Sequence, residues 1–318
     1  MKKIQNHIYI VLLVFIAAFV IGSFYDYPIN SALFHERDTF GLVISVIGTT
    51  PGYGVAAFIG GSAFYLGLKK EFNLGNPTSN ALRILIKVGL IALGVGAFGV
   101  SIFFTGREFF GPNGFNFIGV KRFWGYFIAF PVDAAIAVLG YYLASKSKNE
   151  HLWIVIIVIG LCMTFALVGG TTLFKAIFHR PRFRTVFYYE TDYPGIRFHD
   201  WWQACSNYRS LLKEYPDVLD EEFKSFPSGH ACSAAVFMMG VTFLPLFDEK
   251  YKKLEFPLFY GGLAWLLLVS FARMYVGAHY LTDVSMGAIL AILFFLLGRF
   301  VYNQIINKIE VEPAQKVE

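Results

Sequence analysis

Charged residues and cysteines are scarce in this sequence. Asp, Glu, Lys and Arg make up 15% of its 318 residues, whereas a soluble domain usually has about 25%. Hydrophobic residues make up 56% of the chain, and phenylalanine alone occurs 35 times. A water-soluble fold could not bury this much apolar surface, so the composition excludes an ordinary soluble domain and indicates a polytopic membrane protein.

The three cysteines, Cys162, Cys205 and Cys232, are far apart in the sequence. Two of them fall in apolar segments and only Cys205 lies in a polar stretch, so we expect neither a disulfide framework nor a cysteine metal site. The net charge of +5 is modest, and the cations lie mostly in short loops. We interpret them as determinants of membrane topology rather than as a surface for nucleic acid.

Apolar stretches long enough to cross a bilayer divide the chain. We predict eight transmembrane helices, which cover residues 7–25, 41–68, 82–105, 121–144, 152–174, 229–247, 257–273 and 282–306. The second stretch is interrupted at Thr50-Pro51-Gly52, so we expect a short helix followed by the span itself. The first stretch could imitate a signal peptide, but no clear cleavage site follows it and its length suits an anchor, so we expect an uncleaved helix.

Lysines mark one end of these predicted helices. They precede the first span and follow the second, fourth, sixth and eighth: Lys2, Lys3, Lys69, Lys70, Lys146, Lys148, Lys250, Lys252, Lys253 and Lys308. These positions belong to alternate loops, and the positive-inside rule makes that side cytoplasmic, with both termini inside. The segments around Lys175, Pro227 and Arg273 then fall on the extracytoplasmic face of a multi-pass cell-membrane protein.

A long loop on that outer face covers residues 183–227 and is rich in aromatic residues. A structureless loop of this length is uncommon in a compact fold, so we expect a partly helical cap. Trp201 and Trp202 should lie at the level of the lipid headgroups, where tryptophan is enriched.

The tetrapeptide Pro227-Ser228-Gly229-His230 precedes an apolar run. Pro is favoured at helix starts and Ser is favoured as an N-cap, so a helix should begin here. The unpaired amides of a helix N-terminus bind phosphate oxygens, Gly229 allows close approach of the backbone, and His230 would exchange a proton with a leaving oxygen. The alternative interpretation is an ordinary membrane-helix cap with an incidental histidine.

Arg273, His279 and Asp283 form a second group. His279 and Asp283 are four residues apart and would share one face of a helix. A carboxylate bonded to one ring nitrogen makes the other nitrogen the better nucleophile, and the planar fork of Arg273 suits phosphate oxygens. The alternative is a membrane-edge His–Asp pair with a snorkelling arginine, although ionisable residues in a membrane are expensive and usually functional.

A third, basic group ends the fifth predicted span and contains Lys175, Arg180 and Arg182. Basic residues flank membrane helices routinely, which is the alternative to a functional role. This group, however, lies on the outer side, against the positive-inside trend. Its position therefore suggests an anion bound within the fold.

In this order and spacing, the three segments resemble the motifs of the type 2 phosphatidic acid phosphatase family. Those motifs are Lys, six residues, Arg-Pro; then Pro-Ser-Gly-His; then Ser-Arg, five residues, His, three residues, Asp. Lys175 and Arg182 fit the first spacing, with Arg180 as a possible substitute for Arg182. Phe183 stands where the family has Pro, and Ala272 stands where it has Ser. The resemblance is close from about residue 170 to about residue 290, and eight spans exceed the family's usual six.

The resemblance implies a lipid phosphatase that needs no metal and no cofactor, and no Asp/Glu cluster accompanies the motifs to hold magnesium. His279 would attack phosphorus and form a phosphohistidine, Asp283 would orient His279, and His230 would protonate the leaving group and then activate water. Five further groups would hold the phosphate oxygens: Lys175, Arg182, Arg273 and the amides of Ser228 and Gly229.

We expect one membrane-embedded domain over residues 1–318, with N-terminal helices in 1–150 and a catalytic core in 151–306. Its substrate would be a phosphorylated lipid, either a monoester such as phosphatidic acid or phosphatidylglycerophosphate, or a polyprenyl diphosphate. A diphosphate would need extra cations, which Arg184 or Arg197 could supply.

Two other functions stay open. A lipid phosphotransferase would use the same residues to pass the phosphoryl group to an acceptor other than water. A non-catalytic lipid-binding or transport protein would need cations but no nucleophile, so the complete His–His–Asp set argues against it.

Overall fold

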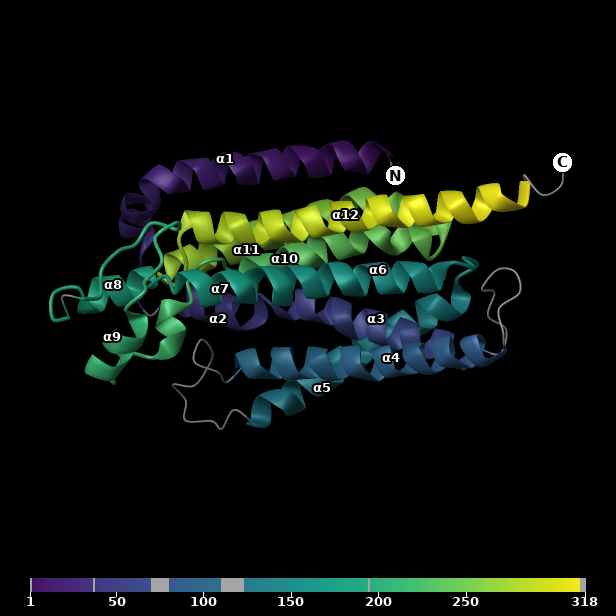
Figure 1. Ribbon diagram of the computed structural model, residues 1–318, viewed down its shortest axis with the longest axis horizontal. Helices are drawn as coiled ribbons and strands as arrows, with labels where there is room; N and C mark the ends of the chain where they lie inside the picture. Colours follow the sequence, from purple (N-terminus) through teal and green to yellow (C-terminus); the bar gives the residue numbers. More distant parts are fainter. Residues whose placement is uncertain (1, 37, 70–79, 110–122, 194, 315–318) are drawn as a thin grey trace.

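The computed structural model describes residues 2–36, 38–69, 80–109, 123–193 and 195–314 of the chain. Every regular element in these residues is helical, and eight helical segments are long and apolar enough to cross a membrane. The all-α prediction and the predicted number of spans are therefore confirmed, and the protein is a multi-pass helical bundle (Figure 1).

The α-helices of the bundle are α1 (Lys2–Leu33), α2 (Thr39–Ile47), α3 (Thr50–Leu68), α4 (Asn80–Phe109), α5 (Phe123–Lys146), α6 (Leu152–Thr164), α7 (Leu173–Phe178), α10 (Gly229–Gly240), α11 (Glu255–Tyr275) and α12 (Leu281–Ala314). A π-helical stretch, η2 (Phe165–Thr172), joins α6 to α7. Two 3₁₀ stretches, η4 (Val241–Leu246) and η5 (Glu249–Leu254), lie between α10 and α11.

The predicted interruption of the second span is present. Helix α2 ends at Ile47, and α3 begins at Thr50 with Pro51 in its first turn, where the missing N–H of proline leaves no helical bond unmade. Helix α1, by contrast, runs well past its predicted end at residue 25. Its last turns contain Asp26 and Asn30, which are buried, so polar residues that end the apolar run do not end the helix.

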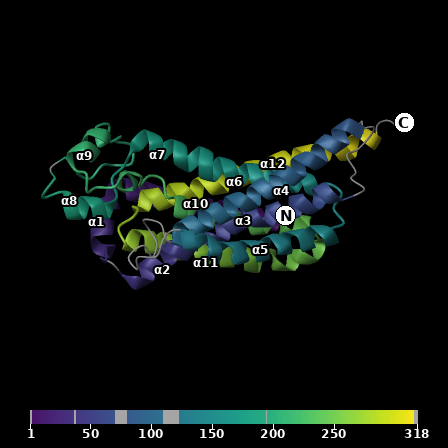
Figure 2. The same ribbon diagram turned by 90° about the horizontal axis from the view of Figure 1, so that it is seen from below.

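The helices run side by side in an elongated bundle (Figure 1, Figure 2). Helices α3, α4 and α5 pack against one another, while α10 packs against α11 and α12, and α1 and α6 both lie against α12. Helix α3 also contacts α6 and α10, so it connects the two groups of helices.

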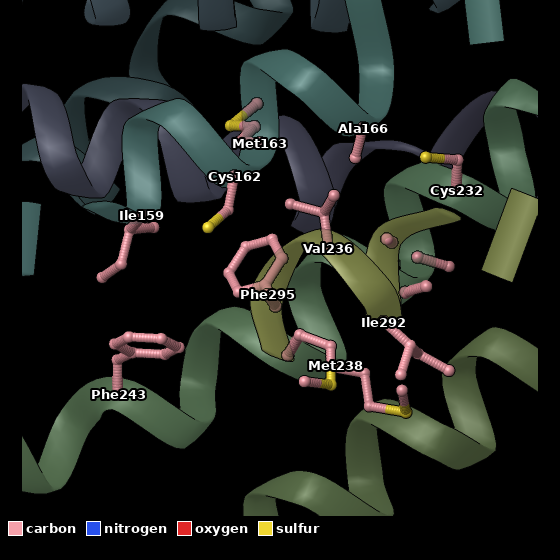
Figure 3. Packing of buried hydrophobic residues seen from close by; sticks show 14 of the residues in the cluster. Ile159, Cys162, Met163, Ala166, Cys232, Val236, Met238, Phe243, Ile292 and Phe295 are labelled. Atoms are coloured by element: carbon pink, nitrogen blue, oxygen red, sulfur yellow. The ribbon is translucent and has the colours of Figure 1, made fainter. Parts of the chain in front are cut away.

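The main core lies between α6, α10 and α12. Buried apolar side chains from these helices and the adjoining stretches pack together (Figure 3), among them Ile159, Cys162, Met163, Val236, Met238, Phe243, Ile292 and Phe295. Close packing of α12 on α10 depends on Gly287, because a Cβ there would lie 2.4 Å from the carbonyl oxygen of Ser228. This packing brings the first turn of α12, with Asp283, next to the first turn of α10.

The turns after α1, α7 and α11 lie at the same end of the bundle, and the C-terminus lies at the opposite end (Figure 1). A cap covers the first of these ends. It contains α8 (Phe183–Tyr189), α9 (Tyr208–Glu214) and the 3₁₀ helix η3 (Asp220–Phe223), so the prediction of a partly helical cap is confirmed. The cap has a small core of its own, made of Ile196, Cys205, Leu211, Val218 and Phe223.

Polar contacts attach the cap to the bundle. Trp201 donates a hydrogen bond from Nε1 to the hydroxyl of Ser23 in α1, at 2.9 Å. Arg184 Nε lies 3.0 Å from an oxygen of Glu222, so this arginine is already committed to the cap. The headgroup position of Trp201 and of Trp202 stays a prediction.

Candidate active site

A cavity of about 720 Å³ lies between α3, α4 and the segment from α6 to α7. Its polar end is lined by five of the predicted site residues, Lys175, Arg182, Gly229, His230 and His279. The other three predicted residues, Ser228, Arg273 and Asp283, are buried next to this group. Segments about a hundred residues apart in the sequence therefore meet at one end of the bundle.

His279 lies in the turn between α11 and α12. Gly277 makes this turn with a φ of 63°, a left-handed conformation that residues with side chains rarely adopt. Two oxygen atoms face Nδ1 of the His279 ring, namely the carbonyl oxygen of Ser225 at 2.7 Å and Oδ2 of Asp283 at 3.6 Å. Because both can only accept a hydrogen bond, we assign the ring hydrogen to Nδ1 and the lone pair to Nε2.

Asp283 is buried and surrounded by donors. Arg180 Nη1 lies 2.7 Å from its Oδ1, while the hydroxyl of Ser225 and the amide of Tyr280 both donate to Oδ2. Arg180 also contacts Oδ2 of Asp26 in α1 at 2.9 Å. These bonds hold the Asp283 carboxylate in place.

The two arginines of the first motif have different surroundings. Arg180 is fully buried and its guanidinium lies between Asp26 and Asp283. Arg182 lines the cavity. A guanidinium held by two carboxylates has little left to offer a phosphate, so the geometry favours Arg182 as the anion ligand, in agreement with the motif spacing.

Ser45 of α2 was not identified from the sequence, yet it contacts two of the predicted residues. Its carbonyl oxygen lies 2.9 Å from Nε2 of His230, and its hydroxyl accepts a hydrogen bond from Nη1 of Arg273. Nε and Nη2 of Arg273 are buried without a hydrogen-bond partner among the described residues, so both can donate to an anion. The ring centroids of His230 and His279 are 6.5 Å apart, which brings both imidazoles to the same end of the cavity.

The N-terminus of α10 differs from the expected geometry in one contact. The side chain of Ser228 caps the helix as expected, but its amide donates to the carbonyl oxygen of Asp283 at 2.9 Å and is not available to an anion. Gly229 and His230 open the helix, where N–H groups lack intrahelical partners. A Cβ atom placed on Gly229 would lie 3.7 Å from Nζ of Lys175, with no other described atom that belongs to a different part of the chain within 4 Å. Space therefore remains beside the Gly229 amide and the Lys175 ammonium group.

Burial changes the ionisation of two groups that lie outside the spans. It lowers the pKa of His279 to about 3, so this imidazole is neutral near pH 7 and can act as a nucleophile. Burial opposes the charged form of Glu222, but Arg184 and Arg182 outweigh it and lower the pKa of Glu222 to about 2. The charged Glu222 thus connects η3 to α8 within the cap.

Away from its polar end, the cavity has apolar walls. They are formed by side chains of α3, α4, α6 and η2, including Ala56, Ile59, Leu93, Ala97, Val100, Leu161 and Val168. Val100, Leu161 and Val168 belong to segments long and apolar enough to cross a membrane, and each is about half exposed. The cavity therefore reaches the surface that faces lipid.

Besides Ser45, sequence reasoning missed two carboxylates at the site. Glu108, near the end of α4, places Oε2 3.8 Å from Nε2 of His230, and Asp26 holds Arg180. Both lie at the ends of apolar stretches. Burying a charge there is energetically costly, so a carboxylate at such a position indicates a nearby partner. Ser45 acts partly through its backbone, which no side-chain pattern reveals.

Part of the chain is similar to known proteins. The family model of the PAP2 superfamily matches residues 151–307. The chain is 35% identical over 89 residues to phosphatidylglycerophosphatase B of Bacillus subtilis, covering 26% of this chain and 42% of that protein. It is 31% identical over 162 residues to phosphatidylglycerophosphatase B of Haemophilus influenzae, covering 45% of this chain and 64% of that protein. The chain thus spans less than two thirds of either relative, and no solved structure matches it significantly. The segment that contains all three motifs is thus similar to the PAP2 superfamily.

Proposed function

We propose that this protein is a membrane phosphatase that hydrolyses a lipid phosphate through a phosphohistidine formed on His279. One observation carries the proposal: a single cavity combines two imidazoles and several cations at one end with apolar walls that reach the lipid-facing surface. A soluble phosphate would need only the polar end, whereas a phosphorylated lipid needs both parts.

In the first step, Nε2 of His279 attacks phosphorus, and the bond from phosphorus to the lipid oxygen breaks. His230 gives that oxygen a proton, so the lipid leaves as an alcohol. The carboxylate of Asp283 balances the charge that develops on the His279 ring. Four groups would hold the equatorial oxygens: Lys175, Arg182, Arg273 and the Gly229 amide.

In the second step, water attacks the phosphohistidine. His230 now lacks the proton that it gave away, so it can take one from the water. The bond between phosphorus and nitrogen breaks, phosphate leaves, and His279 returns to its neutral form. Both imidazoles thereby recover their starting protonation states.

A phosphate monoester fits this site better than a diphosphate. The two cations expected to bind a second phosphate are not available, because Arg184 is committed to Glu222 and Arg197 does not line the cavity. Arg107 and Lys224 do line the cavity, but both are paired with Glu221. The two relatives named phosphatidylglycerophosphatase support the same choice. We therefore propose a monoester such as phosphatidylglycerophosphate or phosphatidic acid as substrate.

We further propose that the site opens to the extracytoplasmic side of the cell membrane. The cavity lies at the end of the bundle that holds the cap, whereas the lysines follow α3, α5 and η4 at the other end. The positive-inside rule then assigns the lysine-bearing end to the cytoplasm.

The test is phosphate release by the purified protein from a panel of lipids, with His279→Ala as the matched variant. We expect cleavage of phosphatidic acid and phosphatidylglycerophosphate above polyprenyl diphosphate, and a loss of several orders of magnitude in His279→Ala because the nucleophile is gone. Negligible rates on all the lipids with good cleavage of soluble sugar phosphates would refute lipid specificity. Labelled phosphate found on a second lipid, and not free in solution, would assign a phosphotransferase instead.

A further inference from the structure

Glu108 supplies a carboxylate to the site from an element that the family model does not cover. Glu108 is the residue before the last of α4, and the match to the family begins only at residue 151. The Glu108 side chain is 13% exposed and the His230 side chain is 9% exposed. Both line the same end of the cavity, with Oε2 of Glu108 3.8 Å from Nε2 of His230.

A carboxylate is an unexpected group in this part of the cavity. The cations that gather there suit a phosphate, and a negative side chain among them repels the same ligand. Its presence therefore weakens anion binding unless it serves another group. Arg107, Arg273, Lys175 and Arg182 act on the Glu108 carboxylate electrostatically, and the ring of His230 lies 3.8 Å from it.

The surroundings of His230 oppose the positive charge of its protonated ring. As a proton donor, the ring of His230 must carry a positive charge. Three groups face this ring: Arg273 from α11, Lys175 from α7 and the ring of His279 from the turn before α12. From α2, only the carbonyl oxygen of Ser45 faces its Nε2. Like charges nearby disfavour the protonated imidazole, and an opposite charge within about 4–6 Å favours it.

The other carboxylates of the site are committed elsewhere. Asp283 is held by Arg180 on the side of His279. Glu221 also lines the cavity, but its Oε1 lies 3.1 Å from Nζ of Lys224 within the cap. Glu108 is thus the carboxylate that contacts His230 among the described residues.

We propose that Glu108 is a positioning residue that acts through His230: the Ser45 carbonyl oxygen holds the ring at Nε2, and the charge of Glu108 favours the protonated imidazole that gives its proton to the leaving lipid oxygen. The assignment rests on the proposed phosphatase function. In chemical terms, the proton passes from His230 to the lipid oxygen as the bond to phosphorus breaks, and Glu108 stays ionised throughout. Each histidine then has a carboxylate at hand, Asp283 for His279 and Glu108 for His230.

The test compares two substrates whose leaving groups differ in their need for a proton. A lipid alkoxide must be protonated as it leaves, whereas p-nitrophenolate leaves readily without a proton. Glu108→Gln keeps the shape and removes the charge. We expect it to lower kcat/KM for phosphatidic acid about 10²-fold, the scale of general acid catalysis, and to lower kcat/KM for p-nitrophenyl phosphate about threefold or less.

The pH profile supplies a readout that a purely structural role would not change. In Glu108→Gln, the alkaline limb of kcat/KM for the lipid should move about 1–3 pH units toward acid, because an opposite charge no longer favours protonated His230. Glu108→Asp keeps the charge and should lie nearer to the wild type. Glu221→Gln is the matched control, and its alkaline limb should move less than half as far.

Equal losses on both substrates, an unmoved alkaline limb, or equal shifts in Glu108→Gln and Glu221→Gln would each overturn the assignment. A gain in kcat/KM on both substrates would also overturn it, because it would mean that Glu108 merely repels the phosphate. His279→Ala separates this inference from the proposed function. If His279→Ala stays active, the phosphatase mechanism itself is wrong. If His279→Ala is inactive but the alkaline limb of Glu108→Gln does not move, only the role of Glu108 is wrong.

Discussion

His279 is held more closely by a backbone carbonyl than by the carboxylate four residues after it. Its Nδ1 lies 2.7 Å from the Ser225 carbonyl oxygen and 3.6 Å from Oδ2 of Asp283. Ser225 belongs to the segment just before α10. The tautomer of the proposed nucleophile is thus set by the chain that leads into the neighbouring motif, and Asp283 contributes mainly charge.

This division of labour predicts a moderate effect for Asp283→Asn. In catalytic triads the same change lowers kcat about 10⁴-fold, because it leaves the histidine in the wrong tautomer. Here the carbonyl oxygen of Ser225 still holds Nδ1–H, so we expect kcat/KM for phosphatidic acid to fall only about 10²-fold. Steady-state kinetics beside His279→Ala check this, and a loss as large as that of His279→Ala would contradict it.

Arg180 and Arg182 should fail in different ways when replaced. Arg180→Ala leaves Asp26 and Asp283 buried without their cation, and breaking a buried pair typically destabilises a protein by about 3–5 kcal/mol. Arg182→Ala should leave the thermal unfolding midpoint nearer to that of the wild type, but weaken inhibition by inorganic phosphate and raise KM.

The control for this pair is Asp26→Asn, which removes a partner of Arg180 that does not line the cavity. It should lower the unfolding midpoint less than Arg180→Ala does, because Asp283 remains as a partner. If Arg180→Ala stays stable and loses phosphate affinity instead, the roles of the two arginines are reversed.

The buried state of His279 predicts how stability depends on pH. The pKa of His279 is lowered by burial to about 3, whereas an unfolded histidine has a pKa of about 6.5. Between these values the unfolded chain binds a proton that the folded chain does not, so this residue makes stability fall as the pH falls, by at most about 1.4 kcal/mol per pH unit. Unfolding midpoints from pH 7 to pH 4 should therefore drop more steeply in the wild type than in His279→Gln. Parallel curves for the two proteins would show that His279 is not buried as a neutral ring.

Activity should survive removal of divalent metal ions. The positive charge that metals supply in many phosphoryl-transfer sites is provided here by Lys175, Arg182 and Arg273, which gather at the polar end of the cavity. We expect phosphate release in excess EDTA to stay within about twofold of the untreated rate. Loss of turnover in EDTA that returns with added magnesium would be incompatible with this mechanism.

Much of this protein can be predicted from its sequence because the information is local. A run of apolar residues long enough to cross a bilayer forms a helix wherever it occurs, since a membrane-embedded backbone must satisfy its own hydrogen bonds. The interruption before α3 is likewise readable, because Pro51 acts on its own turn. The three motifs are short segments whose residue types and spacing already indicate phosphoryl chemistry.

The partners of those motifs are a different matter. Nothing in the sequence connects Asp26 with Arg180, Ser45 with His230, or Glu108 with His230, because each pair joins segments that are far apart along the chain. The predicted Ser228 amide contact also differs from the structure, since the packing of α12 on α10 gives that amide to Asp283.

By itself, then, the sequence determined the helices, their number and the chemical identity of the three motifs, because hydrophobic runs and motif spacing are properties of neighbouring residues. Only the tertiary structure decided which arginine faces the cavity, which atom holds the His279 ring and which carboxylate reaches His230. Those choices depend on how closely whole helices approach one another, and that distance is set by side chains packed between segments far apart in the chain.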